Sequence, residues 1–147
     1  MIDPVVRPAG AAEVEALIDL EHGARAALVD QRGGGRWLEE HQRRGEQWPE
    51  TVETDHVLVA DLDGLVVGYL VLALDADVAR VDEVYVVAEA REVGFGDELI
   101  AHALSAARAA GASVFEGQAL PGDRMTKNLY ERAGITARLI TVSTRLD

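Results

Sequence analysis

The chain has 147 residues, in which 26 acidic side chains outnumber 14 basic ones and give a net charge of -12. This length is typical of one compact domain. A composition of 48% hydrophobic and 27% charged residues is that of an ordinary globular protein and excludes a disordered chain. Nucleic acid and anionic membranes require clustered Lys and Arg, so the acidic balance argues against both partners. We therefore expect a single domain over residues 1–147.

The sequence contains no cysteine. This excludes disulfide scaffolds, thiolate zinc sites and cysteine nucleophiles. The four histidines show no ligand spacing, so we expect no metal site. The N-terminus lacks the basic and apolar segments of a signal peptide, and no run approaches the roughly 18 apolar residues of a membrane span. These features predict a cytoplasmic protein.

Hydrophobic periodicity predicts alternating strands and helices. In chain order they are a strand at 5–7, a helix from 11 to about 28, a short helix at 37–41 that ends before Trp48-Pro49, strands at 57–60 and 65–74 joined by a hairpin turn, a strand at 81–87, a helix between Gly96 and Gly111, a strand at 114–119, a helix from Asp123 to Ala133 and a last strand at 138–145. The strand at 65–74 is apolar on both faces, which is typical of a central strand.

A pair of glycines at the junction between the strand at 81–87 and the next helix points to anion binding. One residue separates Gly94 from Gly96, which allows a tight turn and the close approach of a ligand to bare backbone N–H groups. The helix dipole adds about half a positive charge there, which favours phosphate. The motif lacks the third glycine of a dinucleotide fingerprint and the lysine of a P-loop. The alternative is that the glycines only shape the turn.

Two sequence blocks at this junction and beyond it resemble a known family. The block at 84–89, Val-Tyr-Val-Val-Ala-Glu, precedes Arg91-x-x-Gly94-x-Gly96, and Asn-Leu-Tyr-Glu-Arg-Ala-Gly-Ile follows at 128–135. Together they resemble the Gcn5-related N-acetyltransferases (GNAT). The resemblance implies an α/β (α+β) GNAT fold, with a mixed, mostly antiparallel twisted sheet of six to seven strands, flanked by about four helices and splayed after the fourth strand.

The resemblance also implies a function, the transfer of an acetyl group from acetyl-coenzyme A (acetyl-CoA) to a primary amine by direct attack in a ternary complex. Asp123 stands where the family usually has an asparagine that contacts the coenzyme, although its carboxylate can instead cap a helix. The residues implied to bind acetyl-CoA are Val84, Tyr85 and Val86 through their backbone, Arg91, Glu92, Val93, Gly94, Phe95, Gly96 and Asp97 around the pyrophosphate, and Asp123 and Tyr130.

Direct acyl transfer requires a base to deprotonate the ammonium and an acid to protonate the departing thiolate. Tyr130 matches the family's acid, and the alternative is an aromatic residue that fills the core. For the base, Glu83 ranks above Glu116 and Asp82. Alternation along a strand predicts that Asp82 and Glu83 lie on opposite faces. All three carboxylates are equally well explained as solvated surface groups.

Other readings stay open at this point. A catalytically silent module that binds or senses acyl-CoA, and an acetyltransferase for protein N-termini or lysines, both fit the same blocks. Trp37, Trp48 and Tyr69 are either pocket walls or packing residues. Members of the family often form dimers, so a homodimer is one expected assembly. The amine acceptor matches no specificity class in the sequence.

Overall fold

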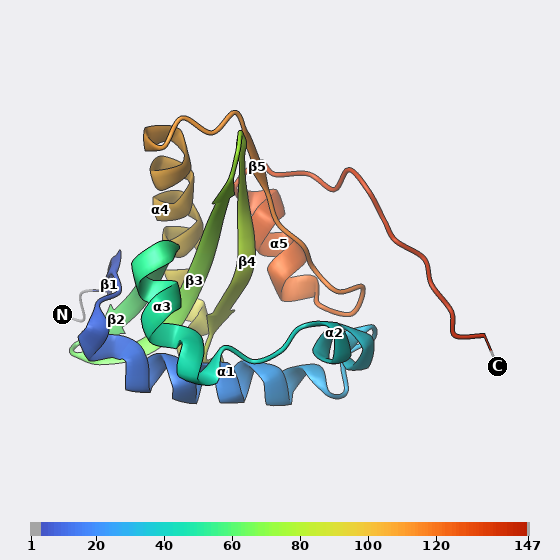
Figure 1. Ribbon diagram of the computed structural model, residues 1–147, viewed down its shortest axis with the longest axis horizontal. Coiled ribbons are helices and arrows are strands. Elements are labelled where there is room, and N and C mark those ends of the chain that lie inside the picture. The colour runs from blue at the N-terminus through green and yellow to red at the C-terminus, as the bar shows by residue number, and fades with distance from the viewer. Residues whose placement is uncertain (1–3, 147) are drawn as a thin grey trace.

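A computed structural model describes residues 4–146 of the chain (Figure 1). In chain order its elements are β1 (Pro4–Pro8), the 3-10 helix η1 (Ala11–Glu13), α1 (Val14–Leu28), α2 (Gly34–Glu40), the 3-10 helix η2 (Gly45–Gln47), α3 (Trp48–Thr54), β2 (His56–Leu62), β3 (Leu65–Asp75), β4 (Val78–Val86), the 3-10 helix η3 (Ala88–Val93), α4 (Phe95–Ala109), β5 (Val114–Glu116) and α5 (Arg124–Arg132). The segment Trp48-Pro49, expected to end a helix, instead begins α3, because proline is well tolerated in the first turn of a helix.

Five strands form one mixed sheet in the order β1-β2-β3-β4-β5. The first three neighbouring pairs are antiparallel, and β4 pairs with β5 in parallel. Strand β3 lies at the centre, and its residues 67–72 are all buried. The predicted central strand is therefore confirmed.

The prediction of six to seven strands is wrong for the described chain, because residues 138–145 form no strand. This segment has no regular secondary structure, its side chains are exposed, and it leaves the body of the protein beyond α5 (Figure 1). Its composition favours a strand, but a strand also needs a partner for its backbone hydrogen bonds. No strand of the described chain pairs with this segment.

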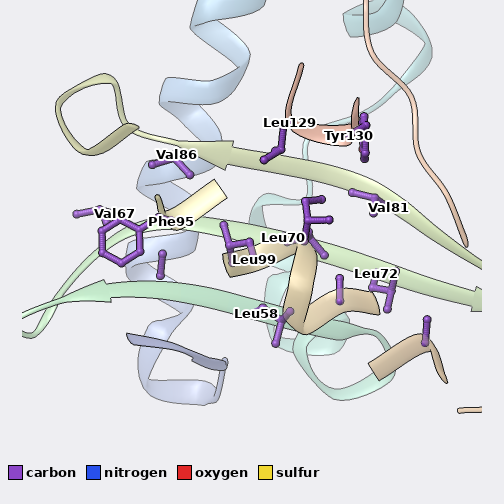
Figure 2. Close-up of a cluster of buried hydrophobic side chains, with 14 of the residues drawn as sticks. Leu58, Val67, Leu70, Leu72, Val81, Val86, Phe95, Leu99, Leu129 and Tyr130 are labelled. Atoms are coloured by element: carbon purple, nitrogen blue, oxygen red, sulfur yellow. The ribbon is translucent and has the colours of Figure 1, made fainter. Parts of the chain in front are cut away.

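Helices α4 and α5 cover one face of the sheet (Figure 1). Phe95, Leu99 and Ile100 of α4 are fully buried at helical spacing, as the periodicity predicts. They pack with Leu129 of α5 and with Leu70 of β3 in one apolar cluster (Figure 2). This cluster fixes the first turn of α4 and the middle of α5 against the sheet.

Helices α1 and α3 cover the opposite face. Leu17 of α1 and Trp48 of α3 are completely buried against Val59, Tyr69 and Val71 of β2 and β3. The ring of Trp48 meets that of Tyr69 edge-on, with 5.5 Å between their centroids. Trp48 and Tyr69 are therefore packing residues of the core.

Strands β4 and β5 pair over only three residues, from Val78 opposite Val114 to Arg80 opposite Glu116. Beyond this point, the described structure places no strand beside residues 81–86 of β4 on that side. The sheet thus opens after its fourth strand, where the resemblance predicts a splay. One edge of β4 remains free along this opening.

Candidate active site

The free edge of β4 presents peptide groups that a ligand can bind. The N–H of Val87 donates to the carbonyl of Val67 on β3 at 2.9 Å. Peptide groups alternate in direction along an antiparallel pair, so those of Val84 and Val86 face the opening. The carbonyl of Val86 has this orientation, because it accepts a hydrogen bond from Nε of Arg91 at 2.9 Å and not from β3.

The backbone of Tyr85 does not face the opening, although the resemblance implied that it binds acetyl-CoA. It is paired with Tyr69 of β3, and the same alternation turns its peptide groups towards β3 and away from the free edge. Its ring lies on the α1 face, where the hydroxyl closely approaches Gly23, and the guanidinium of Arg91 lies 5.9 Å from the ring centroid. A backbone contact between Tyr85 and the coenzyme arm is therefore not supported.

Gly94 joins η3 to α4 in a left-handed conformation, with φ of 91°. Such a conformation favours glycine, since a Cβ would be strained there. No side chain in the described chain caps α4, so N–H groups of its first turn are left for a ligand. Gly96 follows within that turn, and a Cβ on it would lie 3.2 Å from a methyl carbon of Leu129. This turn fits a pyrophosphate: it offers backbone donors at the positive end of a helix dipole.

Charged side chains surround the turn. Arg91 lies across the mouth of the opening, with one guanidinium nitrogen 3.4 Å from the Met125 sulfur of α5. Asp97 accepts from Nε of Arg132 at 2.9 Å, so its charge is paired. Glu92 and Val93 are exposed on η3. The residues that the motif singles out, 91–97, thus lie together at the start of α4.

Tyr130 of α5 lies beside β4 close to the point where β4 and β5 diverge (Figure 2). It is 7% exposed, and its hydroxyl lies against the backbone of Gly117, where a Cβ would overlap it. Asp123 caps α5, because its Oδ1 accepts the N–H of Thr126 at 3.1 Å. The predicted helix cap is confirmed, and it closes the first turn of the helix that carries Tyr130 near its other end.

Burial raises the pKa of the Tyr130 hydroxyl above its ordinary value. The carboxylate of Asp123 raises this pKa further, and a hydrogen bond from the backbone of Gln118 lowers it by less. The phenol is protonated at neutral pH even at the ordinary tyrosine pKa of about 10, and the raised pKa makes it a weaker acid than a free tyrosine. Tyr130 also belongs to the apolar cluster under α4, so its ring packs while its hydroxyl reaches the opening.

Glu83 belongs to a cluster of charged residues on the opposite face of the sheet. Its carboxylate accepts from the Tyr69 hydroxyl at 2.7 Å and from Arg44 at 2.6 Å. The same Arg44 nitrogen lies 3.7 Å from Glu21, which is 3% exposed. Glu21 also accepts the indole N–H of Trp48 at 3.1 Å. We call these residues, with Arg44 at their centre, the Arg44 cluster.

Burial raises the pKa of the Glu83 carboxyl. The charge of Arg44 and the hydrogen bond from Tyr69 lower that pKa by smaller amounts. A carboxylate with a raised pKa accepts a proton more readily near neutral pH. Neither Arg44 nor Glu21 lies in a sequence motif. The sequence does contain one indication that Glu21 is buried: it follows Leu17 by one helical turn and therefore shares its buried face.

A β-bulge separates the two acidic neighbours on β4. The register passes from Val71 opposite Glu83 to Leu72 opposite Val81, so Asp82 is an extra residue. Val81 and Glu83, two residues apart, consequently lie on opposite faces, so the strict alternation on which the expectation for Asp82 and Glu83 rested fails at this bulge. Asp82 accepts from Nε of Arg80 at 2.8 Å near the surface.

Glu116 is the last paired residue of β5, and it directly precedes the Gly117 that contacts Tyr130. Its side chain is 40% exposed, and its carboxylate lies 3.9 Å from Arg138. Glu83 and Glu116 thus occupy different environments, one in a buried hydrogen-bonded cluster and the other at the mouth of the opening.

Comparison with known proteins identifies this arrangement. Residues 17–135 match the Acetyltransferase (GNAT) family. The chain belongs to this family. It is accordingly an acetyltransferase, and acetyl-CoA is its cosubstrate. No curated protein matches the sequence.

Solved structures share the fold of this GNAT chain at low sequence identity. A mutant of the BH1408 protein from Bacillus halodurans is 19% identical with a TM-score of 0.81, covering 97% of this chain and 99% of that one. Ribosomal-protein-alanine N-acetyltransferase from Brucella melitensis biovar Abortus 2308 is 17% identical, with a TM-score of 0.72 and full coverage of both chains. The aminoglycoside enzyme AAC(6')-Iy, in complex with a CoA bisubstrate analogue of acetylneamine, is 17% identical with a TM-score of 0.68, covering 98% and 99%.

A pocket of about 500 Å³ opens on this acetyltransferase between α1 and the segment from Leu38 to Gly45. Glu21 lines it and connects it to the Arg44 cluster. Asp19 and His22 line it from the same helix. Arg25 and Arg43 line it as well, so the pocket holds two carboxylates and two guanidinium groups.

Within residues 4–146 of this GNAT protein, no three His, Asp or Glu side chains come together as metal ligands. No helix of that part of the chain is long and apolar enough to cross a membrane.

Proposed function

We propose that this protein transfers the acetyl group of acetyl-CoA to a primary amine by direct attack, as a single domain over residues 1–147 in the cytoplasm. The observation that carries the proposal is that Tyr130 and Glu83 flank β4 from opposite faces of the sheet, beside its free edge. A thioester held along this edge would have an acid on one side and a base on the other. Direct transfer requires this arrangement, since the amine arrives and the thiolate departs at one carbon.

The chain's own groups supply the binding site. The peptide groups of Val84 and Val86 would bind the pantetheine arm along the free edge of β4. The backbone from Gly94 to Asp97 would bind the pyrophosphate, with Arg91 beside it. Because these contacts use backbone dipoles, they do not require a positive protein. A net charge of -12 is thus compatible with an anionic cosubstrate.

Glu83 is our first choice for the base, before Glu116 and Asp82. An ammonium must lose a proton before it can attack, and the raised pKa of Glu83 suits it to accept one. Arg44 holds this carboxylate in the present structure, so the proton transfer needs Arg44 to shift or a water to relay. A backbone N–H on the free edge of β4 would stabilise the oxyanion. Tyr130 would then protonate the thiolate.

The acceptor that we favour is a small cationic amine. The net charge of -12 attracts a cation to the protein as a whole, and Asp19 offers a carboxylate to an ammonium group in the pocket that it lines together with Arg25 and Arg43. A lysine side chain or a protein N-terminus presents the same group, and the amine panel described below separates these acceptors.

A second candidate function is a silent acyl-CoA sensor. The observation that favours it is that both oxygens of Glu83 already have partners within the chain. Such a module would bind acetyl-CoA but would not release thiol from it.

Two measurements test the proposal in sequence. Acetyl-CoA at a hundred times its Kd should stabilise the fold by about 2.7 kcal/mol, which is visible as a raised Tm. The absence of any shift would reject the binding site. Thiol release is then followed with small polyamines, aminoglycosides, lysine peptides and N-terminal peptides, and the cysteine-free chain adds no background thiol. Binding without thiol release across the panel would favour the sensor.

A further inference from the structure

Glu21 is the one charged side chain of residues 4–146 that is buried, at 3% exposure, and the mechanism described above does not use it. A buried carboxylate is costly unless it is hydrogen-bonded, so its partners indicate its role. It accepts the backbone N–H of Arg44 at 2.8 Å, that of Gly45 at 3.1 Å and the indole N–H of Trp48 at 3.1 Å. Glu21 thus anchors the turn that carries Arg44 to helix α1.

One acceptor position on the Glu21 carboxylate remains unused within the described residues. A carboxylate has about four lone-pair positions, two on each oxygen. Oε1 uses both of its positions, for Gly45 and Trp48, whereas Oε2 accepts only the backbone N–H of Arg44. Nη1 of the Arg44 guanidinium lies 3.7 Å from this same Oε2, which is too far for a hydrogen bond.

The same Nη1 is bonded to a second carboxylate. It lies 2.6 Å from Oε2 of Glu83. A shift of about 1 Å would bring it to the normal length of a charge-assisted hydrogen bond with Glu21 instead. The guanidinium carbon lies 5.2 Å from the ring centroid of Trp48, so so small a shift keeps it within reach of that ring. Arg44 therefore has two alternative carboxylate partners within reach of one nitrogen.

The charges of the Arg44 cluster do not balance. It contains two carboxylates and one guanidinium, and no other cation of the described residues forms an ion pair with Glu21 or Glu83. Buried charges are stabilised when each has a partner. The ammonium group of an acceptor would supply the missing positive charge, and each carboxylate would then have one cation.

We propose that Glu21 and Arg44 are positioning residues, and that the guanidinium of Arg44 moves from Glu83 to Glu21 when the ammonium of the acceptor takes its place at Glu83. The ammonium then gives one proton to the Glu83 carboxylate and keeps the electron pair with which the amine attacks. An acceptor without positive charge cannot replace the guanidinium, so Arg44 selects for an ammonium. This inference rests on the proposed function, in which Glu83 is the base.

The kinetic test uses the full chain and the most active amine of the panel. Glu21→Gln removes the second partner of Arg44 and should raise KM for the amine at least about tenfold, with the Kd for acetyl-CoA unchanged. It should change kcat by less than about threefold, because a saturating amine displaces Arg44 in either case. Glu46→Gln removes an exposed carboxylate from the same turn and is the matched control, with an unchanged KM.

A double-mutant cycle separates this role from a structural one. In an Arg44→Gln background, Glu21→Gln should raise KM by less than about twofold, since no guanidinium is left for Glu21 to receive. If Glu21 only stabilises the turn, the substitution raises KM equally in both backgrounds. Equal increases would therefore overturn the inference.

A second measurement needs neither turnover nor a variant of Glu21. The Nε–H signal of Arg44 is followed by NMR in the wild type with CoA bound, and is assigned by its loss in Arg44→Gln. Butylammonium should shift this signal, whereas butanol, which has the same chain without the charge, should not. A signal that responds to neither probe, or equally to both, would show that an ammonium does not displace the guanidinium.

The failure of this inference differs from the failure of the proposed function. Wild-type turnover in Glu83→Gln would reject Glu83 as the base, and the exchange of partners would be rejected with it. Loss of turnover in Glu83→Gln, together with equal KM increases in the two backgrounds, would reject the exchange alone.

Discussion

Gly117 leaves the space that the hydroxyl of Tyr130 occupies where β4 and β5 diverge. A side chain at position 117 and the phenol at position 130 cannot both be present without movement, because a Cβ would overlap the hydroxyl and its ring carbon. The position of the proposed acid therefore depends on a glycine that lies in no recognised motif.

Gly117→Ala is expected to displace Tyr130 and to lower kcat by at least tenfold, while acetyl-CoA binding persists, since a small misplacement of a reacting group is costly. Steady-state kinetics and calorimetric Kd values check this. Gly35→Ala is the matched control, because a Cβ there meets nothing within 4 Å. Equal kcat values for Gly117→Ala and Gly35→Ala would show that the hydroxyl position is unimportant.

Glu83→Gln is expected to lower kcat by roughly a hundredfold or more, because general base catalysis typically contributes about 10²- to 10⁴-fold. Glu116→Gln and Asp82→Asn, which alter more exposed carboxylates, should change it by less than about threefold. The measurement is kcat at saturating acetyl-CoA with one acceptor. A larger loss in Glu116→Gln than in Glu83→Gln would transfer the role of base to Glu116.

The acid limb of the pH profile reports on Glu83. Burial raises its pKa, so kcat/KM should rise with pH through a value above that of an ordinary glutamate, as the carboxyl loses its proton. Tyr69→Phe removes a hydrogen bond that lowers this pKa and should move the limb to higher pH. A limb that stays in place would mean that another group titrates.

The free energy of unfolding should also depend on the ionisation of Glu83, and the contribution of this group should fall as pH rises. The folded pKa of Glu83 lies above its unfolded value. Its contribution to stability is therefore fully present below the unfolded pKa and is lost as pH rises through the folded one. Glu83→Gln should flatten this part of a Tm profile against pH.

Gly94→Ala tests the turn before α4. A non-glycine residue at φ of 91° costs about 1–2 kcal/mol, and the distorted turn should weaken acetyl-CoA binding. Gly64→Ala is a close control, because Gly64 has the same φ of 91° and open space around it, but it lies in the β2–β3 hairpin. Both variants should lose similar stability, and only Gly94→Ala should raise the Kd. An equal Kd in both would assign Gly94 to folding alone.

Local patterns predicted most of the elements. Leu99 and Ile100 fall on the buried face that their spacing indicates, and Asp123 caps α5 as its position suggests. Features that depend on distant residues escaped prediction. The bulge at Asp82 arises from the register with β3, and the Arg44 cluster joins side chains that are far apart in the sequence. The segment 138–145 has strand propensity but no strand beside it in the described chain, and no local pattern reveals that.

The central claim is amine-dependent acetyl transfer with Tyr130 as the acid, and Tyr130→Phe tests it most directly. Thiol release from acetyl-CoA is measured with and without the best amine, beside the Kd for acetyl-CoA. We expect the wild type to release thiol only when the amine is present. We expect Tyr130→Phe to lose about a hundredfold or more in kcat while its Kd stays within about twofold. A variant that turns over at the wild-type rate would contradict the account.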